Sequence, residues 1–327
     1  MPEKKENKQK WFVVVNPHAG TNKCMHDWPK IKQLLEQEGF DFTFVITERV
    51  YHALSLVQHA VEVDGFKSVL VVGGDGTLNE AVNGIMKQKR FPAEEICIGM
   101  VTVGTGNDWG RMYEIPASYK KQVKILKKGK TFLQDVGMVK YRYASDEEKR
   151  YFVNIAGMGY DALVAKKTNT LKQMGKGGVI TYMISLLTGL FQYENTELTI
   201  EADGKKVYSG QVFSLSIGIC KFNGGGMMQL PNAIPNDGLF DVTLIEKTTK
   251  MRVIRNIKNL YDGSFVKMKE VKTFTGKKFS ITAYPTNKLN LETDGESLGH
   301  SPLDFEVIPK SIRLVVRKKY SIIKENN

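Results

Sequence analysis

The sequence has few of the features that mark a secreted or metal-stapled protein. Cysteine occurs only three times in 327 residues, at Cys24, Cys97 and Cys220. Three cysteines so far apart form neither a disulfide framework nor a pair with the spacing of a metal knuckle, which excludes a disulfide scaffold and a zinc module. Such a chain suits a reducing compartment, and we expect a cytoplasmic protein.

Long hydrophobic runs are also missing. The most apolar window, Gly177–Phe191, has 15 residues, which is shorter than the roughly 17–25 residues of a spanning helix. This window is either a buried helix or the wall or lid of an apolar slot. The first ten residues are charged and contain no apolar signal-peptide core, so we expect a solvated tail there.

Negative charge is scarce relative to positive charge. The 47 Lys and Arg outnumber the 35 Asp and Glu, which gives a formal net charge of +12. That surplus suits nucleic acid, an anionic membrane surface or a phosphorylated substrate. No helix-turn-helix, zinc finger or aromatic RNA-binding strand is recognisable, so we expect no nucleic-acid partner.

One stretch favours the membrane among these partners. Between residues 251 and 261, one helical face carries apolar side chains and another carries basic ones, as in helices that lie on anionic lipid. The apolar residues are Met251, Ile254, Ile257 and Tyr261, and the basic ones are Arg252, Arg255 and Lys258. The alternative is a surface helix with an ordinary buried stripe.

The first 140 residues alternate strands and helices, which predicts an α/β domain with a parallel sheet. The expected strands are Trp11–Val15, Phe40–Ile46, Ser68–Val72 and Ile96–Val101. The expected helices are Trp28–Gln37, Tyr51–Val63 and a third that ends at Met86. In such sheets, ligands bind beyond the carboxyl ends of the strands.

The second half reads mainly as strands, which predicts an antiparallel sandwich or barrel. The expected strands are Tyr151–Ile155, Thr196–Glu201, Val207–Ile219, Phe240–Ile245, Thr273–Ala283, Leu289–Glu292 and Leu303–Ile308. Two helices are expected, Asp161–Leu171 and Thr249–Tyr261. We place a nucleotide-binding domain at 1–138, a β-sandwich substrate domain at 139–300 and a C-terminal segment at 301–327. Edge strands of the second domain could pair in a homodimer.

Three turns at one edge of the predicted parallel sheet have a composition that suits phosphate. They are Asn16-Pro17-His18-Ala19-Gly20-Thr21, Gly73-Gly74-Asp75-Gly76-Thr77 and Gly104-Thr105-Gly106-Asn107-Asp108. Glycine lets backbone N–H groups approach a phosphate, and a helix N-terminus adds a favourable dipole. The turn at 73–77 matches neither a P-loop nor an ordinary dinucleotide fingerprint. A carboxylate in such a turn, Asp75, indicates Mg²⁺ or base chemistry.

Six motifs in order resemble those of the soluble bacterial diacylglycerol kinase family, which is related to sphingosine kinases and more remotely to NAD kinases. They are Asn16-Pro-x-Ala-Gly20, Gly73-Gly-Asp-Gly-Thr-Leu-Asn-Glu80, Gly104-Thr-Gly-Asn-Asp108, Gly224-Gly-Gly-Met227, Pro231-x-Ala-x-Pro-x-Asp-Gly238 and Asp294-Gly-Glu296. The resemblance extends from about Trp11 to Arg317. It implies an NAD-kinase-like or phosphofructokinase-like α/β domain followed by a β-sandwich, with the chain's end returning to the first domain.

The resemblance also implies which residues carry the activity. Glu296 would be the base that takes the proton from a lipid hydroxyl, with Asp294 and Asp75 beside it. A nucleotide, expected to be ATP, would lie on Asn16, Pro17, His18, Ala19, Gly20, Thr47, Gly73, Gly74, Asp75, Gly76, Thr77, Leu78, Asn79, Thr105 and Asn107. A water–Mg²⁺ network would involve Asp75, Asp108 and Asp135. A second, structural Mg²⁺ would bind Asp237 and the backbone oxygens of Ile234 and Leu239.

The function expected from these residues is an ATP- and Mg²⁺-dependent lipid kinase that phosphorylates diacylglycerol to phosphatidic acid at a membrane surface. Alternatives are a kinase of another hydroxyl lipid, such as phosphatidylglycerol or a sphingoid-like lipid, and a kinase of a soluble substrate like the NAD kinases. A nucleotide sensor without catalysis is a third alternative, which the full set of carboxylates disfavours. The apolar window and the basic stretch favour a lipid, because a soluble dinucleotide needs neither.

Overall fold

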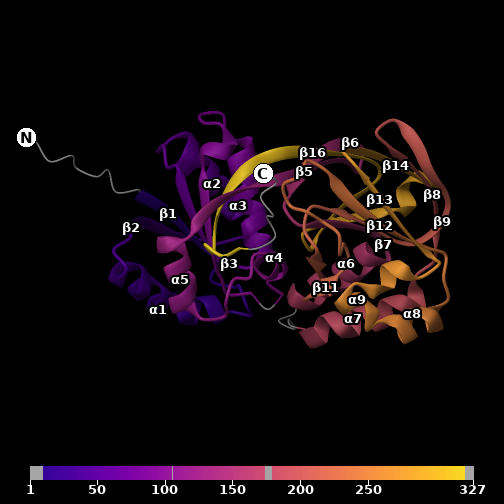
Figure 1. Ribbon diagram of the computed structural model, residues 1–327, viewed down its shortest axis with the longest axis horizontal. Coiled ribbons are helices and arrows are strands. Elements are labelled where there is room, and N and C mark those ends of the chain that lie inside the picture. The colour runs from indigo at the N-terminus through magenta and orange to yellow at the C-terminus, as the bar shows by residue number, and fades with distance from the viewer. Residues whose placement is uncertain (1–9, 105, 174–178, 321–327) are drawn as a thin grey trace, which may run out of the picture.

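The computed structural model describes residues 10–104, 106–173 and 179–320. Figure 1 shows two lobes side by side, the N-terminal one in indigo and purple and the C-terminal one in pink and orange. The N-terminal lobe contains a parallel sheet in the strand order β2-β1-β3-β4. Its strands are β1 (Lys10–Val15), β2 (Asp41–Ile46), β3 (Ser68–Gly73) and β4 (Cys97–Thr102).

Helices cover both faces of this sheet, which explains why the central strands are apolar without alternation. Every residue of β3 and β4 is buried. On one face, α1 (Lys23–Gln37) and α5 (Tyr119–Lys128) pack against the sheet, and on the other α2 (His52–Glu62) and α3 (Asp75–Lys87) do so. The short helix α4 (Asp108–Met112) follows the turn after β4. The predicted α/β domain is therefore confirmed.

The C-terminal lobe is a mostly antiparallel sandwich, as predicted. Its strands pair in the closed order β9-β7-β15-β16-β14-β8-β9, with β12 and β13 added beside β9. The strands are β6 (Asp146–Phe152), β7 (Ile155–Gly159), β8 (Thr196–Ala202), β9 (Lys205–Gly218), β12 (Phe240–Glu246), β13 (Val271–Gly276), β14 (Lys278–Tyr284) and β15 (Asn290–Thr293), with the two-residue strands β10 (Phe222–Asn223) and β11 (Met227–Met228). The aromatic rings of Phe152, Phe240 and Phe305 pack against one another between its layers.

Two long strands join the lobes. In Figure 1, β16 (Glu296–Val316) arches from the C-terminal lobe to the N-terminal one, with β5 (Lys130–Tyr143) beneath it. Arg313 and Leu314 of β16 pair in parallel with Cys97 and Ile98 of β4, so a single sheet runs through both lobes. The expected boundaries at 138/139 and 300/301 therefore fall inside continuous strands instead of linkers.

Two predicted strands are each divided in two, for a local reason. The predicted strand Tyr151–Ile155 is the end of β6 and the start of β7, because the N–H groups at 153–155 turn toward the Asp294 carboxylate. The predicted strand Thr273–Ala283 is divided into β13, which pairs with β12, and β14, which pairs with β8 and β16. The turn between them is held by Asp203 through the N–H groups of Lys277 and Lys278. The strands β5 and most of β6 were not expected.

The predicted basic helix Thr249–Tyr261 is also divided, into α8 (Lys250–Asn256) and α9 (Asn259–Asp262). Its apolar stripe is partly wrong: Ile254 and Ile257 pack inward, but Met251 and Tyr261 are exposed. Arg252 leaves the basic face to pair with Glu270, with 2.8 Å between Nη1 and Oε1. The outward-facing cations of the stretch are thus Arg255 and Lys258.

The apolar window at 177–191 contributes to the helix α7 (Val179–Gln192), which packs on α6 (Tyr160–Gln173). Leu186 and Leu190 face the interior, while Ile184 and Leu187 are exposed. A helix buried on all sides is therefore the wrong interpretation of this window. Within the described ranges, every helix falls short of the length and hydrophobicity that crossing a membrane requires.

Asp135 fixes the place where β16 crosses between the lobes. Its fully buried carboxylate accepts the N–H of Lys310 in a bulge of β16, at 2.6 Å, and the N–H of Gly238, at 2.7 Å. Replacing Asp135 with Ala removes the buried acceptor of both N–H groups, and we expect a loss of about 2–4 kcal/mol in the free energy of unfolding. Urea denaturation measures this loss.

The control is Asp146→Ala, at the exposed tip of the β5–β6 hairpin, which should unfold like the parent. If Asp135→Ala kept the parental stability but lost activity, Asp135 would act in the reaction, as the resemblance implies, and not as a structural anchor.

Candidate active site

The three glycine-containing turns meet at one edge of the parallel sheet. Asn16 Nδ2, just after β1, donates to Thr77 Oγ1 in the first turn of α3 over 2.9 Å. After β4, the Val103 N–H donates to the Gly73 carbonyl at 2.9 Å. The helix cap at Gly74 contributes no side-chain hydrogen bond, so N–H groups of the first turn of α3 remain available. This edge can bind phosphate through backbone N–H groups and the helix dipole.

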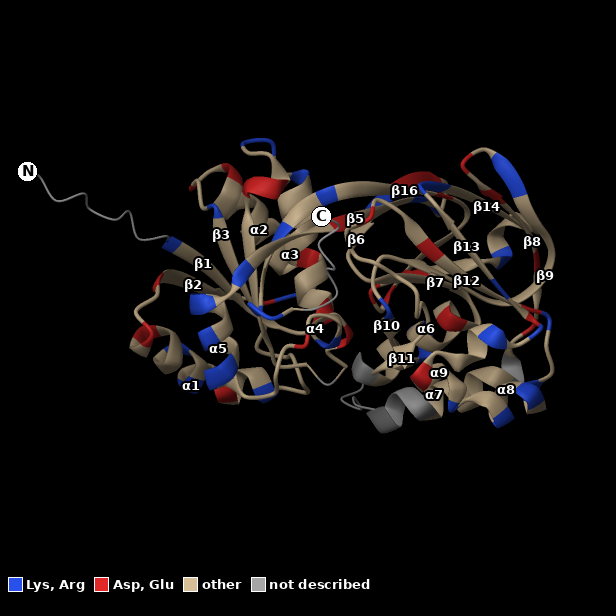
Figure 2. Cartoon of the chain, viewed as in Figure 1, with Lys and Arg blue, Asp and Glu red and all other residues tan. Residues whose placement is uncertain are grey.

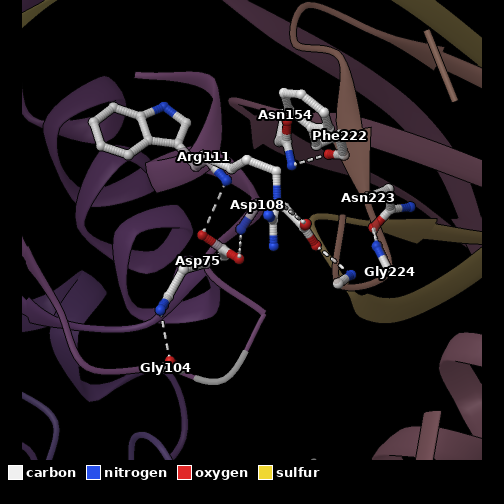
Figure 3. A network of polar contacts seen from close by, with 11 residues as sticks. Asp75, Gly104, Asp108, Arg111, Asn154, Phe222, Asn223 and Gly224 are labelled. Atoms are coloured by element: carbon white, nitrogen blue, oxygen red, sulfur yellow. Dashed lines mark hydrogen bonds and ion pairs between the residues drawn. The ribbon is translucent and has the colours of Figure 1, made fainter. Parts of the chain in front are cut away.

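The half-buried Asp75 and the buried Asp108 form an acidic pair at this edge (Figure 3). The Asp75 carboxylate accepts the N–H groups of Asp108, at 2.9 Å, and Trp109, at 3.3 Å, so it caps α4. Burial, with a further contribution from Asp108, raises the pKa of Asp75 to about 7. Burial likewise raises the pKa of Asp108. Both raised pKa values indicate that the negative charge of these two carboxylates is not fully balanced by nearby positive charge.

The pair also bridges the two lobes. Figure 3 shows the Asp108 carboxylate facing the glycine-rich loop of the other lobe, where the Gly225 N–H donates to Asp108 Oδ2 at 2.7 Å. Arg111 lies 3.8 Å from the other oxygen, Oδ1, and its guanidinium stands over the Phe222 ring. The loop 222–226 thus faces the phosphate edge across the cleft.

The Asp294-Gly295-Glu296 turn brings two carboxylates to the cleft, in different states. Asp294 is buried and accepts four hydrogen bonds, from the side chain of Asn79 and the N–H groups of residues 153, 154 and 155. Glu296 lies against the phosphate turn: a Cβ added to Gly76 would be 3.2 Å from its Oε1. The carboxylate that remains available for chemistry is therefore that of Glu296, and Asp294 fixes the turn that carries it.

Most of the expected nucleotide residues line one large cleft of about 810 Å³ between the lobes. Those that line it are Asn16, His18, Ala19, Gly20, Thr47, Gly74, Asp75, Gly76, Thr77, Asn107 and Asp108. Outside its lining are Pro17, Gly73, Leu78, Asn79 and Asp135. Leu78 belongs to the buried core, and Asn79 reaches Asp294 instead. Thr105 lies outside the described residues.

The cleft is acidic although the protein is basic. Eight carboxylates line it, namely Glu48, Asp75, Glu80, Asp108, Asp161, Glu292, Asp294 and Glu296, and among the described lining residues Arg49 is the one Lys or Arg. A polyphosphate entering such a cleft needs additional positive charge. The described side chains fit a hard cation, because the buried Asp108 Oδ1 and Asn154 Oδ1 have no hydrogen-bond partner among them. Oxygen ligands of this kind, completed by phosphate and water, suit Mg²⁺.

The expected structural metal loop lies away from this cleft. Asp237 Oδ1 accepts the Leu239 N–H at 3.0 Å, and Ile234 is 44% exposed. Asp135 contacts this loop through Gly238 and Pro235. The structure therefore places Asp135 at this loop, and its place in a network with Asp75 and Asp108 stays a prediction. Burial raises the pKa of Asp237 and, to about 6, that of Asp241, so uncompensated negative charge gathers there as well.

A second cavity, narrow and mostly apolar, lies inside the C-terminal lobe between the sandwich and the helices α6–α9. Its volume is about 70 Å³, and the side chains around it include Val164, Leu186, Phe213, Val253, Ile257 and Leu260. Asp161 lines both this cavity and the cleft. It accepts a hydrogen bond from Ser216 Oγ at 2.9 Å, and burial raises its pKa to about 6. An apolar chain in the cavity would thus have a polar end at the cleft.

The residues that sequence reasoning missed are Arg49, Asn154, Asp161 and Glu292. Glu292 follows an apolar strand, and a carboxylate at such a position is a signal that could have been used. Asn154 and Asp161 flank a strand of small residues and carry no comparable signal. Arg49 lies two residues after Thr47 in a loop, and only the folded chain shows that it reaches the cleft.

Comparisons with known proteins agree with this geometry. Residues 10–139 match the family model of the diacylglycerol kinase catalytic domain. Residues 154–316 match that of the YegS C-terminal NAD kinase beta sandwich-like domain. The fold and cleft therefore define a lipid kinase. The chain belongs to the bacterial diacylglycerol kinase and YegS-like family.

Individual relatives match over nearly the whole chain. A diacylglycerol kinase of Staphylococcus carnosus is 27% identical over 94% of each chain, and one of Staphylococcus aureus is 27% identical over 90% of this chain and 88% of its own. A solved diacylglycerol kinase structure from Bacillus anthracis has a TM-score of 0.69 at 20% identity, covering 97% of this chain and all of its own. A second structure from that organism reaches 0.75 at 21% identity with the same coverage. Both structures support the fold.

The two carboxylates of the turn should respond differently to loss of charge. Asp294→Asn places an amide where four donors converge, so we expect the free energy of unfolding to fall by about 2–3 kcal/mol. Glu296→Gln should change it by less than about 0.5 kcal/mol, as is usual for a side chain outside a buried network. Parallel urea titrations compare the two variants. Equal losses would show that Glu296 also holds the turn together.

Proposed function

We propose that this lipid kinase transfers the γ-phosphate of ATP to the hydroxyl of diacylglycerol, with Mg²⁺, and forms phosphatidic acid. The observation that carries the proposal is the position of Glu296 against Gly76 of the phosphate turn. A base for a substrate hydroxyl there would lie beside the bound nucleotide's phosphates. Phosphoryl transfer depends mainly on positioning and charge neutralisation, which the two facing lobes can supply.

In the proposed reaction, the turns at the sheet edge bind the nucleotide and Arg49 contributes positive charge to its phosphates. Asp75, Asp108 and Asn154 would hold a Mg²⁺ ion, which would supply positive charge against the phosphates that the acidic cleft repels. Glu296 accepts the proton of the lipid hydroxyl. The hydroxyl oxygen forms its bond to the γ-phosphorus as the bond to the β–γ bridging oxygen breaks, and ADP leaves.

The apolar cavity supports a lipid acceptor over a soluble one. The cavity has room for a few methylene groups, and a short part of an acyl chain placed along Leu186, Phe213 and Ile257 would leave its polar end near Asp161, at the cleft. A soluble dinucleotide would gain nothing from this cavity. Asp161 favours one second candidate, a lipid with a further hydroxyl or an amine, because such a group can donate to a buried carboxylate.

We also propose that the enzyme works at an anionic membrane, which it contacts with the outer side of α7, α8 and α9. The inner side of these helices lines the apolar cavity. The outer side, here named the α7–α9 surface, consists of Ile184, Leu187, Met251, Arg255, Lys258 and Tyr261, all of them exposed. Figure 2 shows the three helices together at one end of the C-terminal lobe, with basic residues on α8. Apolar and basic groups side by side suit an interfacial position.

The test of function is transfer of labelled phosphate from ATP to a panel of lipids in mixed micelles, separated by thin-layer chromatography. We expect phosphatidic acid from diacylglycerol, and loss of about 10²–10⁴-fold in kcat for Glu296→Gln, which removes the base. Nucleotide binding, followed by calorimetry, should persist in the variant.

Faster labelling of an amine- or diol-bearing lipid would favour the second candidate. Parental kcat in Glu296→Gln would place the base elsewhere.

Membrane association is tested by pelleting with vesicles. Vesicles containing anionic lipid should carry the protein down, and zwitterionic vesicles should do so weakly. Raising the salt from about 0.1 M to about 1 M shortens the Debye length from about 10 Å to about 3 Å, so binding should collapse. Arg255→Glu with Lys258→Glu should weaken pelleting, because each basic residue near the surface contributes about 1 kcal/mol.

The matched control is Lys30→Glu with Lys32→Glu on α1, at the far end of the N-terminal lobe, which should pellet like the parent. Turnover of a short-chain, monomeric lipid should be unaffected in both double variants. Equal weakening by both would show that net charge, and not the α7–α9 surface, drives binding.

A further inference from the structure

Glu292 is a buried carboxylate that the reaction described above does not use. It lies on β15, four residues before Glu296, and is only 1% exposed. Its Oε2 accepts the Gly295 N–H at 2.8 Å, and its Oε1 accepts Asn223 Nδ2 at 3.2 Å. Burial raises its pKa to about 8, so a carboxylate here is costly to the fold. A group kept in the interior at such a cost invites a functional explanation.

The space for this carboxylate is built into the sheet. Glu292 pairs with Gly157 of β7, and a Cβ at Gly157 would lie 2.5 Å from Glu292 Oε1. A side chain at position 157 would occupy the space that the carboxylate fills. Gly157 therefore leaves room for the Glu292 carboxylate beneath the 294–296 turn.

Glu292 and Asn169 together hold the two peptide groups on either side of Gly295, the residue before Glu296. Gly295 has a φ of 85°, in the left-handed region, and no side chain of its own to restrain it. Glu292 holds its N–H, and Asn169 Nδ2 on α6 donates to its carbonyl at 2.9 Å. With Gly295 held on both sides and Asp294 held by four donors, the direction in which the Glu296 side chain leaves the turn is determined.

A second chain of contacts leads from Glu292 to the opposite lobe. Asn223, which donates to Glu292, accepts the Gly224 N–H through its Oδ1 at 2.8 Å. The next N–H, of Gly225, donates to Asp108 (Figure 3). The turn that carries Glu296 and the acidic pair at the phosphate edge are therefore linked through one buried carboxylate.

We propose that Glu292 is a positioning residue that aims Glu296 at the phosphate turn and keeps the glycine-rich loop in register with Asp108. The inference rests on the proposed role of Glu296 as the base. Glu292 touches neither substrate in this scheme. Its effect passes through the Gly295 peptide and through Asn223, and a misplacement of about 1 Å at a reacting group is enough to cost on the order of 10²-fold in rate.

The test replaces Glu292 by Gln, which keeps the volume but loses one acceptor. We expect kcat to fall about 10- to 100-fold, with KM for ATP within about twofold of the parent. The melting temperature should stay near the parental value, because burial already disfavours the charged form of this side chain and Gln keeps its volume and one acceptor. Asn169→Ala, which frees the peptide on the other side of Gly295, should give the same kinetic signature. Asp203→Asn is the matched control: it weakens a carboxylate that holds the remote turn between β13 and β14, and kcat should stay parental.

A double-mutant cycle separates this role from a general one. In the Glu296→Gln background, Glu292→Gln should cause a much smaller further loss, because only the effect that passes through Asn223 to Asp108 then remains. The same fold-loss in both backgrounds, or parental kcat in Glu292→Gln, would overturn the inference. If Glu296→Gln kept parental activity, the proposed role of Glu296 as the base would be wrong. The Glu296→Gln single variant shows this without any substitution at Glu292.

Discussion

The burial of the Asp294 carboxylate among donors from both lobes is the constraint on which the rest of the site depends. Asn79 reaches it from α3 of the nucleotide lobe, and three successive N–H groups at 153–155 reach it from the sandwich. Those N–H groups are diverted from strand pairing, which is why β6 ends and β7 begins there. One carboxylate thus shapes the sheet, joins the lobes and holds the turn that carries Glu296.

The exterior and the cleft carry opposite charge, and each suits a different ligand. The exposed surface accounts for the net charge of +12, while the cleft collects eight carboxylates around Arg49. In the proposed function, the basic exterior attracts anionic membranes over distances of a Debye length. An acidic interior disfavours a bare polyphosphate and favours one that arrives with a divalent cation. The two lobes therefore suit a metal-bound nucleotide on one side and a membrane lipid on the other.

Sequence patterns predicted the elements wherever the periodicity reflects burial. The apolar runs of β1, β3 and β4 identified a parallel sheet covered on both faces, and the turns that follow them identified the phosphate edge. Patterns were less informative where a strand belongs to two lobes. The strands β5 and β16 alternate in part and bend at bulges, so only Leu303–Ile308 of β16 was recognised. Arg252 shows the same limit, because its partner Glu270 is distant in the sequence.

The sequence by itself determined the class of protein, the glycine turns and the identity of Glu296, because these depend on residue type and short spacing. Only the tertiary structure decided what each carboxylate does. Asp294 and Glu296 are two residues apart and chemically alike, yet one is saturated by four donors and the other is left available at Gly76. That difference arises from N–H groups and side chains more than a hundred residues away, which no local pattern encodes.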